Sequence, residues 1–379
     1  MLKYSNRGFY ENRLYHLGFN HFQKIGPMRL KRIEELFPSL ADAWRADSQG
    51  LIEAGLNPKI SEEFVVWRKT FNLNGIPDIL EKKQINYCTW SETDYPEMLK
   101  EISVPPPILY YRGNLADPHD RKRLSVVGSR RPTAYAEKIS ATLLSIVATA
   151  GIEIVSGLAL GVDTLAHCAA LKAQGRTLAV LGSGLNDNCL YPRANRRLAA
   201  DIISSGGAII SEFPPDMPPY KQNFPQRNRI ISGLSSCTLV VEARGKSGAL
   251  ITANYALEQN RDVLAIPGNI FSDLSTGPNQ LIKAGARVVT GAEDILENFQ
   301  IGLKKKTIRA GENNNHRPNN KVEAIVYDLI KRATARAEVI TADEIIKKTE
   351  LDTATINSTL SILEISGLAK NTGSGYALN

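Results

Sequence analysis

Short apolar runs between residues 123 and 299 constrain the fold of this chain more than any other feature. Each run is rich in Val, Ile or Leu without polar alternation, and the runs alternate with helical patterns. Strands of this kind are buried on both faces, as in a largely parallel sheet covered by helices. We therefore expect an α/β fold with an extended, Rossmann-like, doubly wound sheet. The runs are LSVVG, IEIVSG, TLAVLG, AIISEF, TLVVEA, DVLAIPG and RVVTG.

Further segments flank this core. Residues 1–75 show apolar residues at helical spacing in short blocks, including KIGPMRLKRIEELF, which predicts an N-terminal helical domain of the SAM or helix-hairpin-helix type. The hairpin turn either offers N–H groups to a DNA phosphate or serves packing alone. Residues 76–300 hold the core and its connector, where a proline run precedes a short aromatic strand. Residues 301–320 read as a basic linker.

The C-terminal residues 321–379 contain three amphipathic helix patterns followed by LAKNTGSGYALN, which suits a two-stranded wing. Thr341 and Glu344 form a capping-box pattern at the second helix. We expect a winged-helix domain. Its third helix, DTATINSTLSILEISG, contains no Lys or Arg, so we expect a protein-contact or accessory role for it rather than base reading.

Charge and cysteine spacing narrow the function classes. The net charge of +7 and the pI of about 9.1 favour a polyanionic partner. The four cysteines form no CxxC pair, and HExxH and GxSxG motifs are absent, so we expect no metal, no disulfide and no catalytic residue. The N-terminal residues lack an apolar signal-like region, and no run of about eighteen apolar residues occurs, so we expect a cytoplasmic protein without a membrane segment.

The turn after the first apolar run, VVGSRRPTAY, is a candidate phosphate site. Open α/β sheets bind ligands at the carboxyl ends of their strands, where free backbone N–H groups and helix dipoles favour anions. Gly128 permits a tight turn, Ser129 can donate to an anion, and Arg130 and Arg131 add positive charge. Alternatively, the glycine serves only the turn and the arginines are solvated.

The second turn, SGLALGVDTLAH, places Ser156 and Gly157 before a helix. Asp163 and His167 in that helix are four residues apart and share one face, which would allow an acid–base pair. We favour a structural role instead, with a helix-capping Asp and a hydrogen-bonded core His.

The third turn resembles half of a dinucleotide fingerprint. Gly182, Ser183 and Gly184 fit its start, but Asp187 replaces the last glycine, so we expect no NAD. In the YPRAN motif that follows, Arg193 adds positive charge and Asn195 is assigned to the same site.

Two later segments extend the candidate site. In KQNFPQRNR, the cations Lys221, Arg227 and Arg229 surround Phe224, which we expect to be exposed, a mixture that suits a strand of DNA. In ARGKSGALITA, the GKS triplet resembles the end of a P-loop, but Val240 stands where that motif needs a glycine, so we expect no ATP hydrolysis and no cofactor. We expect Ser247 to cap the next helix, with Gly248 and Thr252 near a bound phosphate.

In order and spacing, these motifs resemble the DprA family, also called Smf or DNA-processing protein A, from about residue 94 to residue 295. The resemblance implies a homodimer that binds and shields single-stranded DNA during natural transformation and interacts with RecA. It also implies loading of RecA onto strands coated with single-strand-binding protein. Transferred motif by motif, the DNA contacts are Gly128, Ser129, Arg130, Arg193, Asn228 and Arg229, with Lys221 as a looser transfer.

The same resemblance places the dimer surface near NQLIKAGA, with Leu281 and Ile282 as candidates, although both would also suit an ordinary core. The expected function is therefore a non-catalytic, single-stranded-DNA-binding recombination mediator. The alternative is a nucleotide-hydrolysing enzyme of the phosphoribohydrolase type on the same fold. Its PGGxGTxxE-type motif is replaced here by RGKSGALITANYALEQ.

Overall fold

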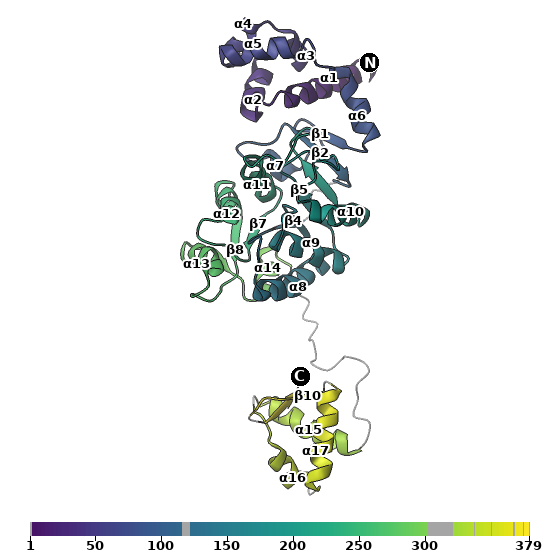
Figure 1. The fold of residues 1–379 in the computed structure, drawn as a ribbon, viewed down its shortest axis with the longest axis vertical. Helices are drawn as coiled ribbons and strands as arrows, with labels where there is room; N and C mark the ends of the chain where they lie inside the picture. The colour runs from purple at the N-terminus through teal and green to yellow at the C-terminus, as the bar shows by residue number, and fades with distance from the viewer. Residues whose placement is uncertain are drawn as a thin grey trace. The chain divides into compact units, whose positions relative to one another are not determined.

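The computed structural model describes residues 2–115, 122–301 and 321–378, apart from the single positions 337, 350, 367 and 374. The chain divides into two compact units, Met1–Gly302 and Leu303–Asn379 (Figure 1). Apart from Ile301, the predicted basic linker lies outside the described residues. Within the described ranges, no helix is both long and apolar enough to cross a membrane.

A nine-stranded sheet forms the centre of the first unit (Figure 1). In chain order its strands are β1 (Asn86–Thr89), β2 (Ile108–Gly113), β3 (Arg123–Val127), β4 (Glu153–Ser156), β5 (Thr177–Val180), β6 (Ala208–Ser211), β7 (Cys237–Val240), β8 (Asp262–Ala265) and β9 (Arg287–Val288). The spatial order is β1-β2-β6-β5-β4-β3-β7-β8-β9, with β3 to β9 paired in parallel. Each predicted apolar run contains a strand, and the predicted doubly wound sheet is confirmed.

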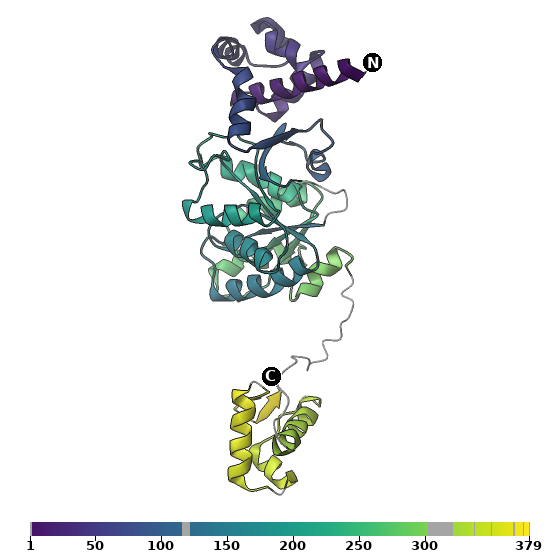
Figure 2. The same ribbon diagram turned by 90° about the vertical axis from the view of Figure 1, so that its right-hand side faces the viewer.

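Helices cover both faces of this sheet (Figure 2). They are α8 (Ala134–Thr149), α9 (Val162–Lys172), α10 (Arg196–Ser204), α11 (Asn223–Gly233), α12 (Gly248–Glu258), α13 (Thr276–Lys283) and α14 (Ala292–Asn298), with the 3-10 turns η2 (Arg193–Asn195) and η3 (Asp273–Ser275). One face packs against α11 and α12, and the other against α8, α9 and α14. Val126 and Val127 of β3 enter opposite layers, as the two-residue period of a strand requires.

The connector supplies more of the sheet than the sequence predicted. Strands β1 and β2 pair antiparallel and extend the sheet beyond β6, with a short helix, α7 (Glu97–Lys100), between them. Tyr95 Oη donates to the carbonyl oxygen of Pro106 at 2.7 Å and holds the proline run in place before β2. The apolar pattern of β1 is weak, so the sequence does not predict this strand. Pairing with β2 sets its place in the sheet.

The N-terminal helices pack around an aromatic core. They are α1 (Leu2–His21), α2 (Pro27–Leu36), α3 (Leu40–Arg45), α4 (Ser48–Glu53), α5 (Pro58–Trp67) and α6 (Ile76–Lys82), with the 3-10 turn η1 (Leu73–Gly75). The rings of Phe19 and Phe64 stack with centroids 5.0 Å apart. Asn20 in α1 accepts from Tyr110 Oη at 3.0 Å and donates to the carbonyl oxygen of Glu212 at 3.1 Å, so α1 is fastened to the sheet.

The second unit contains three helices and a two-stranded sheet in its described part. They are α15 (Lys321–Thr334), α16 (Ala342–Thr349), α17 (Thr353–Ile365), β10 (Ala369–Asn371) and β11 (Tyr376–Leu378). The predicted capping box is confirmed, because Thr341 N–H donates to the Glu344 carboxylate at 2.9 Å and Glu344 N–H donates to Thr341 Oγ1 at 3.3 Å. The assignment of this unit as a winged helix, and of the N-terminal helices to the SAM or helix-hairpin-helix type, stays a prediction.

Candidate nucleic-acid interface

A cavity of about 600 Å³ opens at the carboxyl ends of the parallel strands. The turn after β3, the loop after β4, helix α11 and the start of α12 surround it, where the strand order turns back between β3 and β7. Doubly wound sheets bind their ligands at this point. Nine predicted site residues line the cavity, namely Gly128, Arg130, Lys221, Phe224, Arg227, Asn228, Ser247, Gly248 and Thr252.

The other predicted DNA-binding residues lie outside the cavity lining, and several of them hold the surrounding loops. Ser156 Oγ donates to the carbonyl oxygen of Val126 at 2.7 Å, and Asn195 Nδ2 donates to that of Leu158 at 2.8 Å. Ser156 and Asn195 therefore support the site from behind, whereas Arg131 and Arg193 are exposed. A DNA contact through any residue of this group stays a prediction. The residues are Ser129, Arg131, Ser156, Gly157, Gly182, Ser183, Gly184, Arg193, Asn195 and Arg229.

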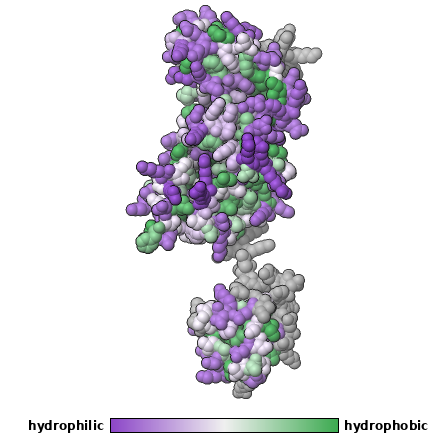
Figure 3. Space-filling model, viewed as in Figure 1, coloured by the Kyte–Doolittle hydropathy of each residue, from purple (hydrophilic) through white to green (hydrophobic). Residues whose placement is uncertain are grey.

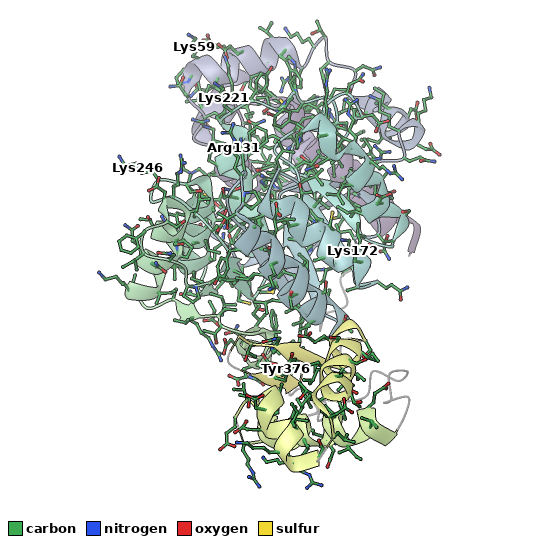
Figure 4. The ribbon with its side chains drawn as sticks, turned by 60° about the horizontal axis from the view of Figure 1, so that its bottom comes forward. Lys59, Arg131, Lys172, Lys221, Lys246 and Tyr376 are labelled. Carbon is green, nitrogen blue, oxygen red and sulfur yellow. The ribbon has the colours of Figure 1, made fainter. Side chains whose placement is uncertain are left out.

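Accessible positive charge at the cavity comes from Arg130 and Lys221. Both side chains are exposed, and neither has an ion-pair partner within the described part of the chain. Figure 4 shows Lys221 and Arg131 toward one side of the first unit and Lys172 toward the other. On the face drawn in Figure 3, strongly hydrophilic side chains are interspersed with hydrophobic ones over the first unit. The cavity rim is therefore positively charged and open to an anion.

Two aromatic rings meet at the cavity. Phe224 is half-buried rather than exposed, so the predicted exposure was wrong. Its ring lies against Gly182, where an added Cβ would come within 2.9 Å of Phe224 Cδ1. The ring of Tyr191 lies 5.7 Å from that of Phe224, tilted by 59°, and also lines the cavity. Tyr191 was missed from the sequence, although its position directly before Pro192 in a predicted strand-end turn was a signal.

The start of α12 faces the cavity. Ser247 is the N-cap and accepts from Ala249 N–H at 3.3 Å, which confirms the predicted cap. Asn228 Nδ2 donates to the carbonyl oxygen of Gly248 at 3.2 Å and ties α11 to this helix end. Since the first N–H groups of a helix lack partners within the helix and carry partial positive charge, this end of the cavity favours an anion.

Arg227 is buried in the cavity floor and is not a free cation beside Phe224. Its guanidinium donates to the carbonyl oxygens of Gly157, at 2.8 Å, and Val180. Burial lowers the pKa of Arg227 to about 10, while the nearby Asp163 carboxylate acts in the opposite direction. Burial also raises the pKa of Asp163. The positive charge of Arg227 and the negative charge of Asp163 therefore partly offset each other in the buried floor of the cavity.

Arg229 is also buried, behind the cavity. Its guanidinium binds the Glu212 carboxylate through two hydrogen bonds of 2.6 and 2.7 Å, and it donates to the carbonyl oxygen of Val104 at 2.9 Å. The Glu212 carboxylate raises the pKa of Arg229 above its usual value, although burial alone would lower it. The expectation of an accessible cation at Arg229 was therefore wrong, because its guanidinium is bound to the Glu212 carboxylate.

Asp163 and His167 do not pair, as no hydrogen bond joins them among the described residues. The Asp163 carboxylate accepts from the N–H groups of Gly157 and Ala159, at 3.1 and 3.2 Å, so it fastens the loop after β4 instead of capping α9. His167 Nδ1 lies 2.7 Å from Thr177 Oγ1. The structural interpretation is confirmed for His167, whereas Asp163 holds a loop and is not the expected cap.

The Thr177 hydroxyl also determines the tautomer of His167. Thr177 Oγ1 gives its one hydrogen to the carbonyl oxygen of Ile154 at 2.7 Å, so it must accept the bond from the imidazole. Nδ1 therefore carries the proton. Burial lowers the pKa of His167 to about 3, with Arg227 acting in the same direction.

The predicted dimer residues lie in α13. Leu281 is partly buried and packs against the hydrophobic core on the α11 and α12 face of the sheet, whereas Ile282 is half-buried. A dimer through this helix stays a prediction. Among the described residues, no group of three or more His, Cys, Asp or Glu side chains is placed to hold a metal ion.

Comparisons with known proteins bear on this arrangement. A family model described as DNA recombination-mediator protein A matches residues 86–300. The chain is 43% identical over 282 residues to Protein Smf of Escherichia coli (strain K12), which covers 74% of each protein. It is 43% identical over 213 residues to the DNA processing protein DprA of Bacillus subtilis (strain 168), covering 56% of this chain and 71% of that protein. The X-ray structure of DNA processing protein A from Streptococcus pneumoniae matches with a TM-score of 0.62 and 33% identity, over 75% of this chain and 95% of that one.

The fold and the cavity define a Rossmann-like protein with a cavity at the carboxyl ends of its strands. The chain belongs to the DNA recombination-mediator protein A family, which includes proteins named Smf and DprA. The resemblance read from the sequence is confirmed. The family description names a recombination mediator, which agrees with the expected non-catalytic role and not with the phosphoribohydrolase alternative.

The lowered pKa of His167 predicts a pH dependence of stability. Protonation favours the unfolded chain, where the pKa is near 6.5, so stability is complete above that pH and is lost as the pH falls toward the folded pKa of about 3. At pH 4 the loss from this residue is about 3 kcal/mol. Denaturant unfolding at pH 7 and pH 4 measures it. A His167→Leu variant should lose less stability between these pH values, and an identical loss in both proteins would contradict the assignment.

The Arg229–Glu212 pair predicts a stability effect that separates a structural role from DNA contact. Arg229→Met leaves the Glu212 carboxylate buried and unpaired, which should lower the free energy of unfolding by about 3–5 kcal/mol, and adding Glu212→Leu should restore most of it. The matched control is Arg287→Ala, which breaks an exposed pair with Glu297 and should cost about 1 kcal/mol or less. An Arg229→Met protein that unfolds normally but no longer binds DNA would show a direct contact instead.

Proposed function

We propose that this chain binds single-stranded DNA in the strand-end cavity and acts as a recombination mediator without catalytic turnover. The observation behind the proposal is the composition of the cavity. It combines two exposed cations, Arg130 and Lys221, which have no ion-pair partner among the described residues, with the rings of Phe224 and Tyr191. Cations neutralise phosphates and aromatic rings stack on bases, which is the combination that single-strand-binding proteins use.

The aromatic rings favour an unpaired strand over a duplex. In a duplex the faces of the bases are covered by their neighbours, so a ring inside a cavity reaches them only after the strands separate. Each stacked base contributes about 1–3 kcal/mol without regard to sequence. Binding should therefore depend on salt and on strand separation but little on base order.

The family assignment extends the proposal to recombination. We propose that the protein shields incoming DNA during natural transformation, binds a RecA-type recombinase, and loads it onto strands coated with single-strand-binding protein in the cytoplasm. A homodimer through α13, with Leu281 and Ile282, joins two cavities. Because one strand then reaches both sites, its overall affinity exceeds that of either site.

We propose accessory roles for the segments on either side of the core. We propose the predicted organisation of an N-terminal SAM or helix-hairpin-helix-like domain in residues 1–75, a core in 76–300, a basic linker in 301–320 and a winged helix in 321–379. Helix α17 contains no Lys or Arg. A helix that reads bases in a major groove normally carries such residues, so α17 more naturally contacts protein.

Removal of the two free cations should weaken DNA binding and its salt dependence. The Arg130→Ala, Lys221→Ala double variant should lose about tenfold or more in affinity for a labelled oligothymidylate, because two phosphates lose their partners. The slope of log affinity against log salt should fall by about 1.4, at 0.7 per phosphate. Fluorescence anisotropy at several salt concentrations measures both quantities.

The matched control for this prediction removes two exposed lysines outside the cavity lining, Lys59→Ala with Lys172→Ala (Figure 4). It should bind like the unaltered protein. Equal affinity for duplex and single strand, or an equal loss in both double variants, would contradict the proposed site.

The mediator role predicts an effect on the recombinase itself. On single strands coated with single-strand-binding protein, the chain should shorten the lag before RecA filaments form, followed through RecA ATP hydrolysis. The Arg130→Ala, Lys221→Ala variant should leave the lag unchanged, because it cannot hold the strand. If the unaltered protein binds DNA normally and has no effect on the lag, the mediator role fails while the DNA-binding role stands.

A further inference from the structure

A second cavity lies between the loop after β8 and the start of α8. Its volume of about 660 Å³ is large enough for a long side chain, and its lining includes Thr133, Tyr135, Glu242, Ile270 and Ser275. It shares no lining residue with the strand-end cavity. We infer that the second cavity is a docking site for an arginine side chain of a partner protein. This role goes beyond the proposed function and does not depend on DNA binding.

Glu242 gives this cavity its negative charge. The residue is 3% exposed, and its carboxylate has no ion-pair partner within the described part of the chain. Oε2 accepts from Thr133 N–H at 3.0 Å and Oε1 accepts from Thr133 Oγ1 at 2.6 Å, so each oxygen keeps a lone pair. The start of α8 offsets only about half of the carboxylate charge. The remaining negative charge favours a cation in the cavity.

Ser275 supplies a second polar group to the same cavity. The residue is 5% exposed, and its hydroxyl makes no hydrogen bond to another described residue. Buried hydroxyl groups normally have a hydrogen-bond partner, so this one indicates a place for a polar group of a ligand. The hydroxyl and the Glu242 carboxylate both line the cavity and can receive the same ligand.

The hydroxyl hydrogens of two other lining residues are already used inside the protein. Thr133 Oγ1 gives its hydrogen to Glu242, and Tyr135 Oη donates to the carbonyl oxygen of Pro267 at 2.9 Å. These oxygens can therefore only accept further hydrogen bonds. A cation with several N–H donors meets this requirement, whereas a phosphate or a carboxylate does not.

The arrangement favours a guanidinium over an ammonium group. The two oxygens of Glu242 each keep a lone pair, which suits the parallel N–H groups of a guanidinium. The ring of Tyr135 is half-exposed and lines the cavity, so a planar cation can stack on its face. Arginine satisfies both conditions, because its donors are fixed in one plane.

An exposed apolar tip beside the cavity indicates that the arginine belongs to a protein. Ile270 and Phe271 are 81% and 90% exposed, and Ile270 also lines the cavity. Hydrogen bonds hold the turn that carries them, from Ser272 N–H to the carbonyl oxygen of Asn269 at 3.0 Å and from Phe271 N–H to Asn269 Oδ1 at 2.9 Å. Exposed apolar side chains next to a polar pocket are typical of protein-binding surfaces. The partner therefore presents an arginine with apolar neighbours.

Titration of the full-length protein with N-acetyl-arginine amide tests the inference. Saturation-transfer NMR should detect binding with a dissociation constant on the order of 1 mM, because a single side chain supplies few contacts. The citrulline analogue has nearly the same shape without the charge and should bind about tenfold more weakly or less. Equal binding of the two compounds would overturn the inference.

Tripeptides test whether the apolar tip takes part. An arginine between two leucines should bind about tenfold more tightly than an arginine between two glycines, because the tip then buries apolar surface. Phe271→Ala should abolish this difference and leave N-acetyl-arginine amide unaffected. A leucine advantage that is unchanged in Phe271→Ala would show that the tip makes no contact and would remove the protein partner from the inference.

Variants of the polar groups locate the arginine. Glu242→Gln keeps an acceptor for Thr133 N–H but removes the charge, so N-acetyl-arginine amide should bind about tenfold more weakly. Ser275→Ala removes a hydroxyl that no described residue uses, so the protein should fold normally and bind this compound about threefold or more weakly. Arginine binding that survives both substitutions would overturn the inference.

The matched controls are Glu258→Gln and Val66→Ala, two exposed side chains outside both cavity linings, which should bind the arginine compounds normally. Every variant should still bind a labelled oligothymidylate, because the two cavities share no lining residue, so a failure of the DNA-binding role is seen separately. Sedimentation velocity of Phe271→Ala distinguishes the remaining occupant. If this variant no longer self-associates, the tip contacts a second copy of the chain and the inference fails.

Discussion

The cavity depends on the buried guanidinium of Arg227, which joins separate segments of the chain. From α11 it reaches the carbonyl oxygens of Gly157, after β4, and Val180, at the end of β5. Asp163 supplies the opposite charge and holds the loop after β4 through two N–H groups. A Cβ on Gly157 would lie 2.6 Å from Arg227 and 2.7 Å from Asp163, so only glycine fits between them. Without this guanidinium, the buried Asp163 carboxylate would lose the opposite charge near it, and two carbonyl oxygens would each lose a donor.

The cations of this region therefore divide into two groups with different tasks. Arg227 and Arg229 are buried and build the site, because both donate to backbone carbonyl oxygens and Arg229 also binds the Glu212 carboxylate. Arg130 and Lys221 are exposed and remain available to a ligand. A basic sequence motif such as QRNR can thus contribute to DNA binding without touching DNA. Substitution of its arginines changes the stability of the fold, so a loss of DNA binding does not by itself show a direct contact.

Features that depend on neighbouring residues were predictable from the sequence. The apolar runs from β3 to β9, the cap at Ser247 and the capping box of Thr341 and Glu344 follow from periodicity and local hydrogen bonding. Strand β1 was missed because four residues with a weak pattern become a strand only by pairing with β2. The accessible cavity residues Arg130 and Lys221 were found, since the carboxyl ends of parallel strands meet at one edge of the sheet.

The sequence by itself determined the fold class, the family and the strand-end turns, because each is written in short-range patterns or in the order of motifs. Only the tertiary structure decided which cations are free, since Arg229 is distinguished from Lys221 by a carboxylate 17 residues away, on Glu212. It also decided that Tyr191 joins Phe224 and that Asp163 turns to the loop and not to His167. The burial of a side chain and its pairing with another depend on contacts between segments that are distant in the chain, so no local sequence pattern predicts them.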